Sequence, residues 1–221
     1  AFTGDRRNAC LGRVNAAHAI LQLGDHQRAE RALRSALADA DRMGLHNVSA
    51  LARQNLGPAL GRMGALAEAR ALENLAIRAF SGQENRRQEG RARAYLAQNL
   101  LLEGELEAAE SEARTAVARL APIPPLRAFA LGVLAQVRLA RLHAEEALAV
   151  AREGMEVLLS LPGMEEGESL LRLVYAEALM ATGNLPAAAD AIDVARQRVL
   201  GRAARVVDPG WRASFLEKVP E

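Results

Sequence analysis

The stretch Gly24-Asp25-His26-Gln27-Arg28-Ala29 places a glycine after the apolar end of one helical segment and an alanine five residues later. The same pair returns as Gly64 with Ala69, Gly104 with Ala109 and Gly183 with Ala188, and Leu142 with Ala147 fills the remaining gap. The copies follow one another at intervals of about 40 residues, a spacing close to that of known helical repeats. The sequence therefore predicts a repeat protein.

Small residues recur at two further places in every unit. Seven residues before the turn position lie Ala17, Gly57, Ala97, Ala135 and Ala176, and twelve residues after it lie Ala36, Ala76, Ala116, Gly154 and Ala195. Small side chains at fixed places on successive helices allow two antiparallel helices to approach closely. No stretch alternates as a strand does. We expect an all-α fold, an α-α superhelix of about five helical hairpins with a short C-terminal capping helix.

Glycine and proline breaks at 43–45, 81–83, 122–125 and 161–163 separate the units. We expect a single solenoid domain over residues 1–221, with units at about 5–43, 46–80, 85–120, 125–160 and 165–204 and a capping segment at 205–221. Asp25 and Asn184 follow turn glycines and are expected to cap the next helix. Trp211, Phe215 and Val219 form one apolar stripe, which predicts a helix that covers the exposed core of the last hairpin.

Composition excludes several classes of partner. The 28 basic and 27 acidic residues leave a formal net charge of +1, too little for a general attraction to nucleic acid or to an anionic membrane. No window approaches the apolar length of a membrane span. Cys10 is the single cysteine and cannot form an internal disulfide, so we expect a cytoplasmic protein in which Cys10 is a small buried residue.

The inventory of reactive residues does not predict catalysis. His18, His26, His46 and His143 share no metal-ligand spacing, and the single lysine, Lys218, lies in no phosphate-binding loop. We expect no cofactor and no metal, and a chain that is not itself an enzyme. Glu165, Glu166 and Glu168 are interpreted as the acidic first turn of a helix, with paired catalytic carboxylates as the alternative.

The pattern Leu56-Gly57, Gly64, Ala69 and Ala76 resembles a tetratricopeptide repeat (TPR), and the other units resemble it with alanine for the first glycine. The long period is similar to that of bacterial signalling proteins and kinesin light chains. At the C-terminus, Val207-Asp208-Pro209, Arg212, Ser214-Phe215-Leu216 and Val219-Pro220-Glu221 resemble the closing segment of multidomain bacterial regulators. In those, a Ser/Thr protein kinase or nucleotide cyclase domain precedes an ATPase module and TPRs.

A TPR solenoid binds peptides on its concave side, which the first helix of each unit lines. Our candidate groove residues are therefore those residues of the first helices that lie outside the apolar face used for packing. They are Asn15, His18, Gln22, Gln54, Asn55, Arg62, Arg91, Tyr95, Gln98, Gln136, Arg138 and Glu177. TPR co-chaperones hold a peptide carboxylate with lysine, arginine and asparagine, and of the corresponding places here only Asn55 matches. Chaperone-tail binding is therefore disfavoured.

The resemblance implies a protein-interaction or regulatory module, the C-terminal part of a larger bacterial signalling protein such as a Ser/Thr kinase. Its expected partners are a protein or peptide, its own upstream domains, or a second copy in a homodimer. Two alternatives remain open: an effector-sensing helical-repeat domain of a transcription activator, and an intramolecular spacer that packs on its own ATPase or kinase domain.

Overall fold

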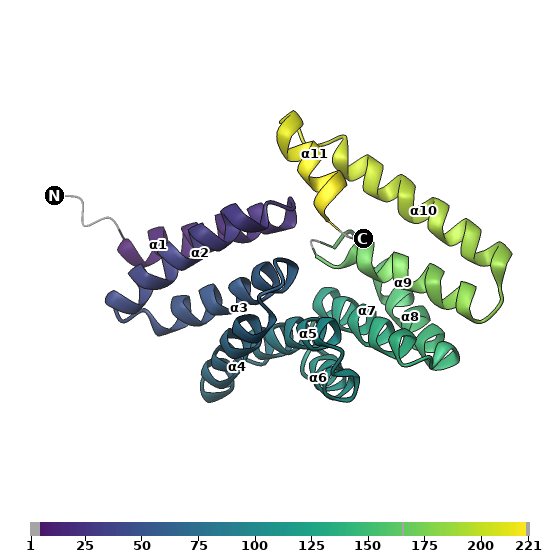
Figure 1. Ribbon diagram of the computed structural model, residues 1–221, viewed down its shortest axis with the longest axis horizontal. Coiled ribbons are helices and arrows are strands. Elements are labelled where there is room, and N and C mark those ends of the chain that lie inside the picture. The colour runs from purple at the N-terminus through teal and green to yellow at the C-terminus, as the bar shows by residue number, and fades with distance from the viewer. Residues whose placement is uncertain (1–4, 165, 220–221) are drawn as a thin grey trace.

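The computed structural model describes residues 5–164 and 166–219, and over these residues the chain forms helices joined by short turns. Figure 1 shows them arranged as an arc of hairpins. The helices are α1 (Arg6–Gln22), α2 (His26–Arg42), α3 (His46–Arg62), α4 (Leu66–Gly82), α5 (Arg86–Glu103), α6 (Leu106–Arg119), α7 (Pro124–Ala140), α8 (Ala144–Leu159), α9 (Glu168–Ala181), α10 (Leu185–Ala203) and α11 (Pro209–Lys218). The fold is an all-α superhelix of helical hairpins, as predicted.

Each hairpin turn contains one residue with left-handed backbone geometry. The φ angle is +83° at Gly24, +81° at Gly64, +82° at Gly104 and +83° at Gly183. Leu142 adopts the same conformation with φ +63° although it carries a Cβ atom. The predicted caps are also present, since Asp25 Oδ1 accepts from the backbone N–H of Arg28 at 3.0 Å and Asn184 Oδ1 from that of Ala187 at 3.4 Å. The turn positions were therefore correctly identified.

The small residues at the two recurring positions are all buried. Consecutive helices pack as antiparallel neighbours, and α1, α3, α5, α7 and α9 also contact one another in series. The first helices therefore form the inner, concave wall of the arc (Figure 1). Cys10 is fully buried in the first hairpin, where its Sγ atom lies 3.4 Å from the carbonyl oxygen of Ala36.

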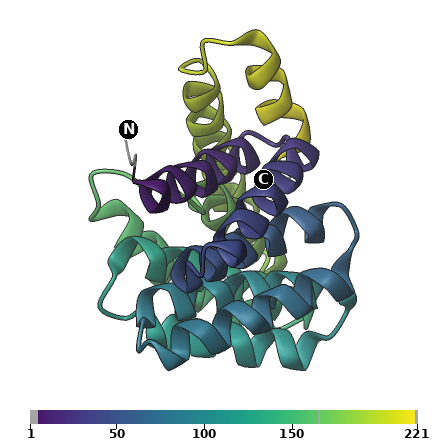
Figure 2. The same cartoon turned by 90° about the vertical axis from the view of Figure 1, so that its left-hand side faces the viewer.

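Helix α11 contacts α10 of the last hairpin, where the Arg202 side chain lies over the ring of Phe215. Its cover of that hairpin is partial, since Ile192 and Leu200 on α10 remain exposed. Helix α11 also turns back toward the first hairpin, so that purple and yellow segments approach each other in Figures 1 and 2. The short connection 204–208 lets α11 fold inward, and Phe215 is buried against the concave side. No helix in the described part of the chain is long and apolar enough to cross a membrane.

Candidate functional site: the concave cavities

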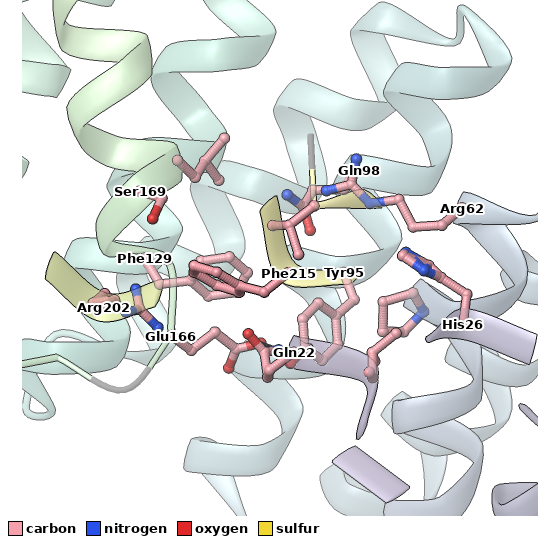
Figure 3. A pocket seen from close by; sticks show the side chains of 15 residues that line it. Gln22, His26, Arg62, Tyr95, Gln98, Phe129, Glu166, Ser169, Arg202 and Phe215 are labelled. Carbon is pink, nitrogen blue, oxygen red and sulfur yellow. Dashed lines mark hydrogen bonds between the residues drawn. The ribbon is translucent and has the colours of Figure 1, made fainter. Parts of the chain in front are cut away.

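Two adjoining cavities lie on the concave side. The larger has a volume of about 830 Å³, and its polar wall consists of Asn15, His18 and Gln22 from α1, Arg87 and Arg91 from α5, and Arg202 from α10. Its apolar wall includes Ile123, Leu126, Met164 and Phe215. The smaller, of about 100 Å³, is lined by residues that include Gln22, Arg62, Tyr95, Gln98 and Phe129 (Figure 3). Gln22, Glu166, Arg202 and Phe215 line both cavities.

Glu166 lies where these cavities meet and connects three parts of the chain. Arg91 donates from Nε to Glu166 Oε2 at 3.0 Å, and Nε also lies 3.0 Å from the Tyr95 hydroxyl. The Tyr95 hydroxyl donates to Glu166 Oε1, and Gln22 Nε2 donates to the same oxygen at 3.3 Å. His18 Nε2 lies 2.8 Å from Arg91 Nη2. Donors from α1 and α5 thus converge on one carboxylate from the α8–α9 connection.

Burial and charge together set the ionisation of this cluster. Burial disfavours the charged guanidinium of Arg91, but Tyr95 and Glu166 outweigh it and raise the pKa of Arg91 above its ordinary value. Burial raises the pKa of Tyr95 well above its ordinary value, an effect that Arg91 opposes and Glu166 reinforces. At neutral pH, Arg91 is therefore charged and Tyr95 keeps its proton. Arg91 and Glu166 thus form an ion pair within a hydrogen-bonded cluster. Such a cluster is suited to a structural role or to binding a ligand.

Several candidate groove residues do line the concave cavities. Asn15, His18 and Gln22 lie along α1, and Arg91, Tyr95 and Gln98 lie along α5. Arg62 and Gln98 also line a small cavity of about 40 Å³ together with Gln136. The structure therefore brings α1, α3, α5 and α7 side chains of the predicted set to one surface.

Four other candidates do not line these cavities. Gln54 and Asn55 on α3 are buried, at only 0% and 4% exposed. Arg138 pairs with Glu110 at 3.5 Å and with Glu146 at 3.7 Å. Glu177 is half-buried, and burial raises its pKa. The placement of Gln54 and Asn55 in an accessible groove was wrong.

The sequence analysis missed Glu166 as a groove residue. Glu168, not Glu166, begins α9, and it pairs with Arg172 at 2.9 Å and Arg198 at 3.1 Å. Only Glu168 fits the predicted acidic first turn, while Glu165 lies outside the described residues. Gly167 at φ +82° packs against the Phe129 ring and turns Glu166 toward Arg91. The sequence signal that could have identified Glu166 is Gly167, the glycine directly after Glu165 and Glu166.

The ionisable groups of the site are already paired with one another. The Glu166 carboxylate is already neutralised by Arg91, and Tyr95 is hydrogen-bonded to it. Among the described residues, no three histidine, cysteine, aspartate or glutamate side chains are grouped so that they could hold a metal ion.

Comparison with solved structures identifies similar folds. A protein of Podosopora anserina described as a kinesin light chain with nearly identical TPR-like repeats is 17% identical, with a TM-score of 0.63 over 87% of this chain and 96% of that chain. A variant of that protein gives a TM-score of 0.64 at 17% identity, over 87% and 95% of the two chains. BtubC from P. vanneervenii is also 17% identical, with a TM-score of 0.64 over 84% of this chain and 77% of that one.

No family model matches the sequence, and no curated protein matches it. At this identity the structural neighbours establish the TPR-like fold alone.

Proposed function

We propose that this TPR-like solenoid is a protein-interaction module that binds a segment of a protein partner in its concave groove. The observation that carries the proposal is the larger cavity, whose walls combine amide and guanidinium groups on one side with apolar side chains on the other. An amide side chain can donate to and accept from a peptide backbone at the same time. TPR-like folds in general bind protein partners through such preformed surfaces.

The charges of the lining favour an acidic or carboxylate-bearing segment. Arg87, Arg91 and Arg202 line the larger cavity, where Glu166 is the single acidic residue of the lining. A guanidinium group binds a carboxylate in a two-pronged geometry that is both strong and directional. In our proposal the segment contributes a carboxylate to this basic wall and places apolar side chains against Ile123 and Leu126.

The wider context is part of the same proposal. The chain is the C-terminal part of a larger bacterial signalling protein, a Ser/Thr kinase or a similar regulator. This rests on the resemblance of the segment from Val207 to Glu221 to the closing segment of such regulators. In that setting, the solenoid recruits the partner while another domain performs the chemistry.

One observation favours a second function, the sensing of a small effector. The larger cavity, at about 830 Å³, falls in the usual range of small-molecule sites, and apolar and polar groups converge on it. A small anionic effector in this cavity would also contact Arg91. Binding of the effector would then change the contacts between α1, α5 and the α8–α9 connection.

The proposed function can be tested with two variants of matched composition. The groove variant combines Asn15→Ala, Gln98→Ala and Gln136→Ala, all of which line the cavities. The control combines Asn47→Ala, Gln27→Ala and Gln197→Ala, which are exposed and line none of the cavities described. Both should keep the circular dichroism of the original chain.

The readout is quantitative capture of bacterial proteins by each variant, followed by calorimetric titration with a peptide from any captured partner. A partner that the control captures and the groove variant loses would support groove binding. Equal capture by the two variants would refute it and favour an intramolecular spacer. Loss of a small molecule instead of a protein, detected by mass spectrometry, would favour the effector.

A further inference from the structure

Helix α11 attaches to the rest of the solenoid through a small set of contacts. Phe215 is the one buried residue of α11, and it lines both concave cavities. Figure 3 shows it at the smaller of the two. Trp211 lies one helical turn earlier on the same face. Leu216, the next residue along, is 44% exposed. The helix therefore docks through two aromatic rings four positions apart.

Guanidinium groups from two distant helices cover these rings. The Arg28 side chain of α2 lies over Trp211, with its Cζ atom 5.1 Å from the ring centroid. The Arg202 side chain of α10 lies over Phe215 at 5.7 Å. Cations over aromatic faces recognise the ring and not the surrounding sequence. A different helix with aromatic residues at the same spacing could make the same contacts.

The turn of the first hairpin is shaped for close approach by α11. A Cβ atom added at Gly24 would lie 2.7 Å from the carbonyl oxygen of Ser214 and 3.1 Å from Lys218 Cβ. Gly183 has the same φ angle of +83° as Gly24, and a Cβ atom added there meets nothing within 4 Å. Gly24 is thus distinguished from its counterpart by the presence of α11.

The segment that carries α11 is also held together internally. Arg212 donates from Nε and Nη2 to the carbonyl oxygen of Val206, at 3.0 and 2.8 Å. Asp208 caps the helix by accepting from the backbone N–H of Trp211 at 2.8 Å. These bonds lie within residues 206–212, so they persist if the helix leaves the groove. The structure therefore allows α11 to move as a unit about the connection to α10.

From these contacts we propose that the surface formed by Gly24, Arg28 and Arg202 is a binding site for an amphipathic helix with aromatic residues four positions apart, and that α11 is its displaceable resident. A partner helix of this kind takes the place of α11, and docking of the partner and of α11 exclude each other. The inference rests on the proposed function, since it specifies which protein segment enters the concave groove.

The test uses Gly24→Ala and Gly183→Ala in the full chain. Both substitutions place an alanine in the same left-handed turn, but only the one at position 24 collides with α11. The probe is a fluorescein-labelled peptide with the sequence of residues 208–219, and a scrambled peptide is the control. Each glycine substitution is combined with Phe215→Ala, which weakens docking of α11 and leaves Gly24, Arg28 and Arg202 unchanged. Because the added Cβ atom at position 24 meets any helix seated as α11 is, fluorescence anisotropy should show at least tenfold weaker binding of the peptide to Phe215→Ala, Gly24→Ala than to Phe215→Ala alone or to Phe215→Ala, Gly183→Ala. Equal binding to all three would overturn the proposal.

A second pair of variants tests the proposal by changing α11 instead of the turn that it contacts. Phe215→Ala removes the buried ring of α11, and Leu216→Ala removes an exposed neighbour. Phe215→Ala should bind the peptide more tightly, and Leu216→Ala should bind it as the original chain does. Trp211, the single tryptophan, reports release of α11 directly, through a red-shifted emission and stronger acrylamide quenching in Gly24→Ala and Phe215→Ala. Unchanged emission in both variants would overturn the proposal.

Failure of this inference differs from failure of the proposed function. If the groove variant loses its partner while Phe215→Ala leaves peptide binding unchanged, the groove binds with α11 in place and only the proposed displacement is refuted. If peptide binding rises in Phe215→Ala while the groove variant and its control capture the same partners, the helix site is supported and the proposed groove function is refuted.

Discussion

The carboxyl group of Glu73 on α4 packs directly onto Gly57 of α3, where a Cβ atom at position 57 would overlap it. The small residue of the second unit therefore makes room for a side chain as well as for a neighbouring helix. Glu73 is 0% exposed, and within the described part of the chain its two carboxyl oxygens have no hydrogen-bond partner. Burial accordingly raises the pKa of Glu73 well above its ordinary value.

Glu73→Gln should stabilise the protein at neutral pH. Because the folded-state pKa lies above the unfolded one, the folded state holds a proton that the unfolded state has lost, and stability falls as pH rises through that window. Glutamine carries no charge and avoids this loss, so we expect a gain of about 1 to 3 kcal/mol in the free energy of unfolding. Urea unfolding at a series of pH values measures it.

The two stability curves should converge below about pH 4, where Glu73 is protonated in both states. Glu145→Gln, at an exposed position on α8, is the control and should follow the original chain. A variant at position 73 that is less stable at neutral pH would contradict the assignment of a neutral buried carboxyl group.

Leu142→Gly should also stabilise the protein. Leu142 is 89% exposed and adopts φ +63°, a conformation that costs a residue with a Cβ atom about 1 to 2 kcal/mol. Glycine removes this strain but loses more conformational entropy on folding, which offsets about half of the gain. We expect a net gain of about 0.5 to 1 kcal/mol, or a rise of about 1 to 4 °C in the melting temperature. Leu185→Gly, on the exposed side of α10, should instead lower it.

Glu166→Gln should destabilise the protein by about 2 kcal/mol, because it leaves the guanidinium of Arg91 without its carboxylate. The expected loss of stability is smaller than for a fully buried ion pair because the Arg91 and Glu166 side chains are 16% and 10% exposed. Glu107→Gln removes an exposed partner of Arg141 and should have little effect. A double variant Arg91→Met, Glu166→Gln should recover part of the loss. No difference between the variants at 166 and 107 in urea unfolding would refute the role of Glu166.

Glu168 should give a pH dependence of opposite sign to that of Glu73. Burial acts to raise its pKa, but hydrogen bonds from Arg172 and Arg198 outweigh burial and hold the pKa below its ordinary value. The stabilisation is therefore present above the unfolded-state pKa and is lost as pH falls through the folded-state pKa. Glu168→Gln should cost about 2 kcal/mol at neutral pH, and the difference should shrink on acidification. A constant difference down to pH 3 would show that packing, not charge, causes the loss.

The repeat was predictable from the sequence because local chemistry determines it. A left-handed turn requires glycine in most units, and close helix packing requires small residues, so both leave a periodic signal. Leu142 was placed correctly by period alone, although its residue type gave no indication of φ +63°.

The groove residues were only partly predictable. Helical spacing tells which face a residue occupies relative to its own helix, but not how far a neighbouring helix covers that face. Gln54 and Asn55 on α3 are buried, while Asn15, which occupies in α1 the place of Asn55, is exposed. Glu166 and Phe215 reach the groove through tertiary contacts that cross 70 residues or more, and no local pattern encodes them.

In an open solenoid each unit contacts only its neighbours, so the units at the two ends can unfold independently of each other. The approach of Ser214 to Gly24 and the cover of Trp211 by Arg28 connect the two ends of the described array. The ion pair between Arg91 and Glu166 adds a second cross-connection between the halves. Because α11 contacts the first hairpin, unfolding of that hairpin also exposes α11. Amide hydrogen exchange in α1 and α11 should therefore be correlated, and the array should behave as a closed loop instead of a row of separable units.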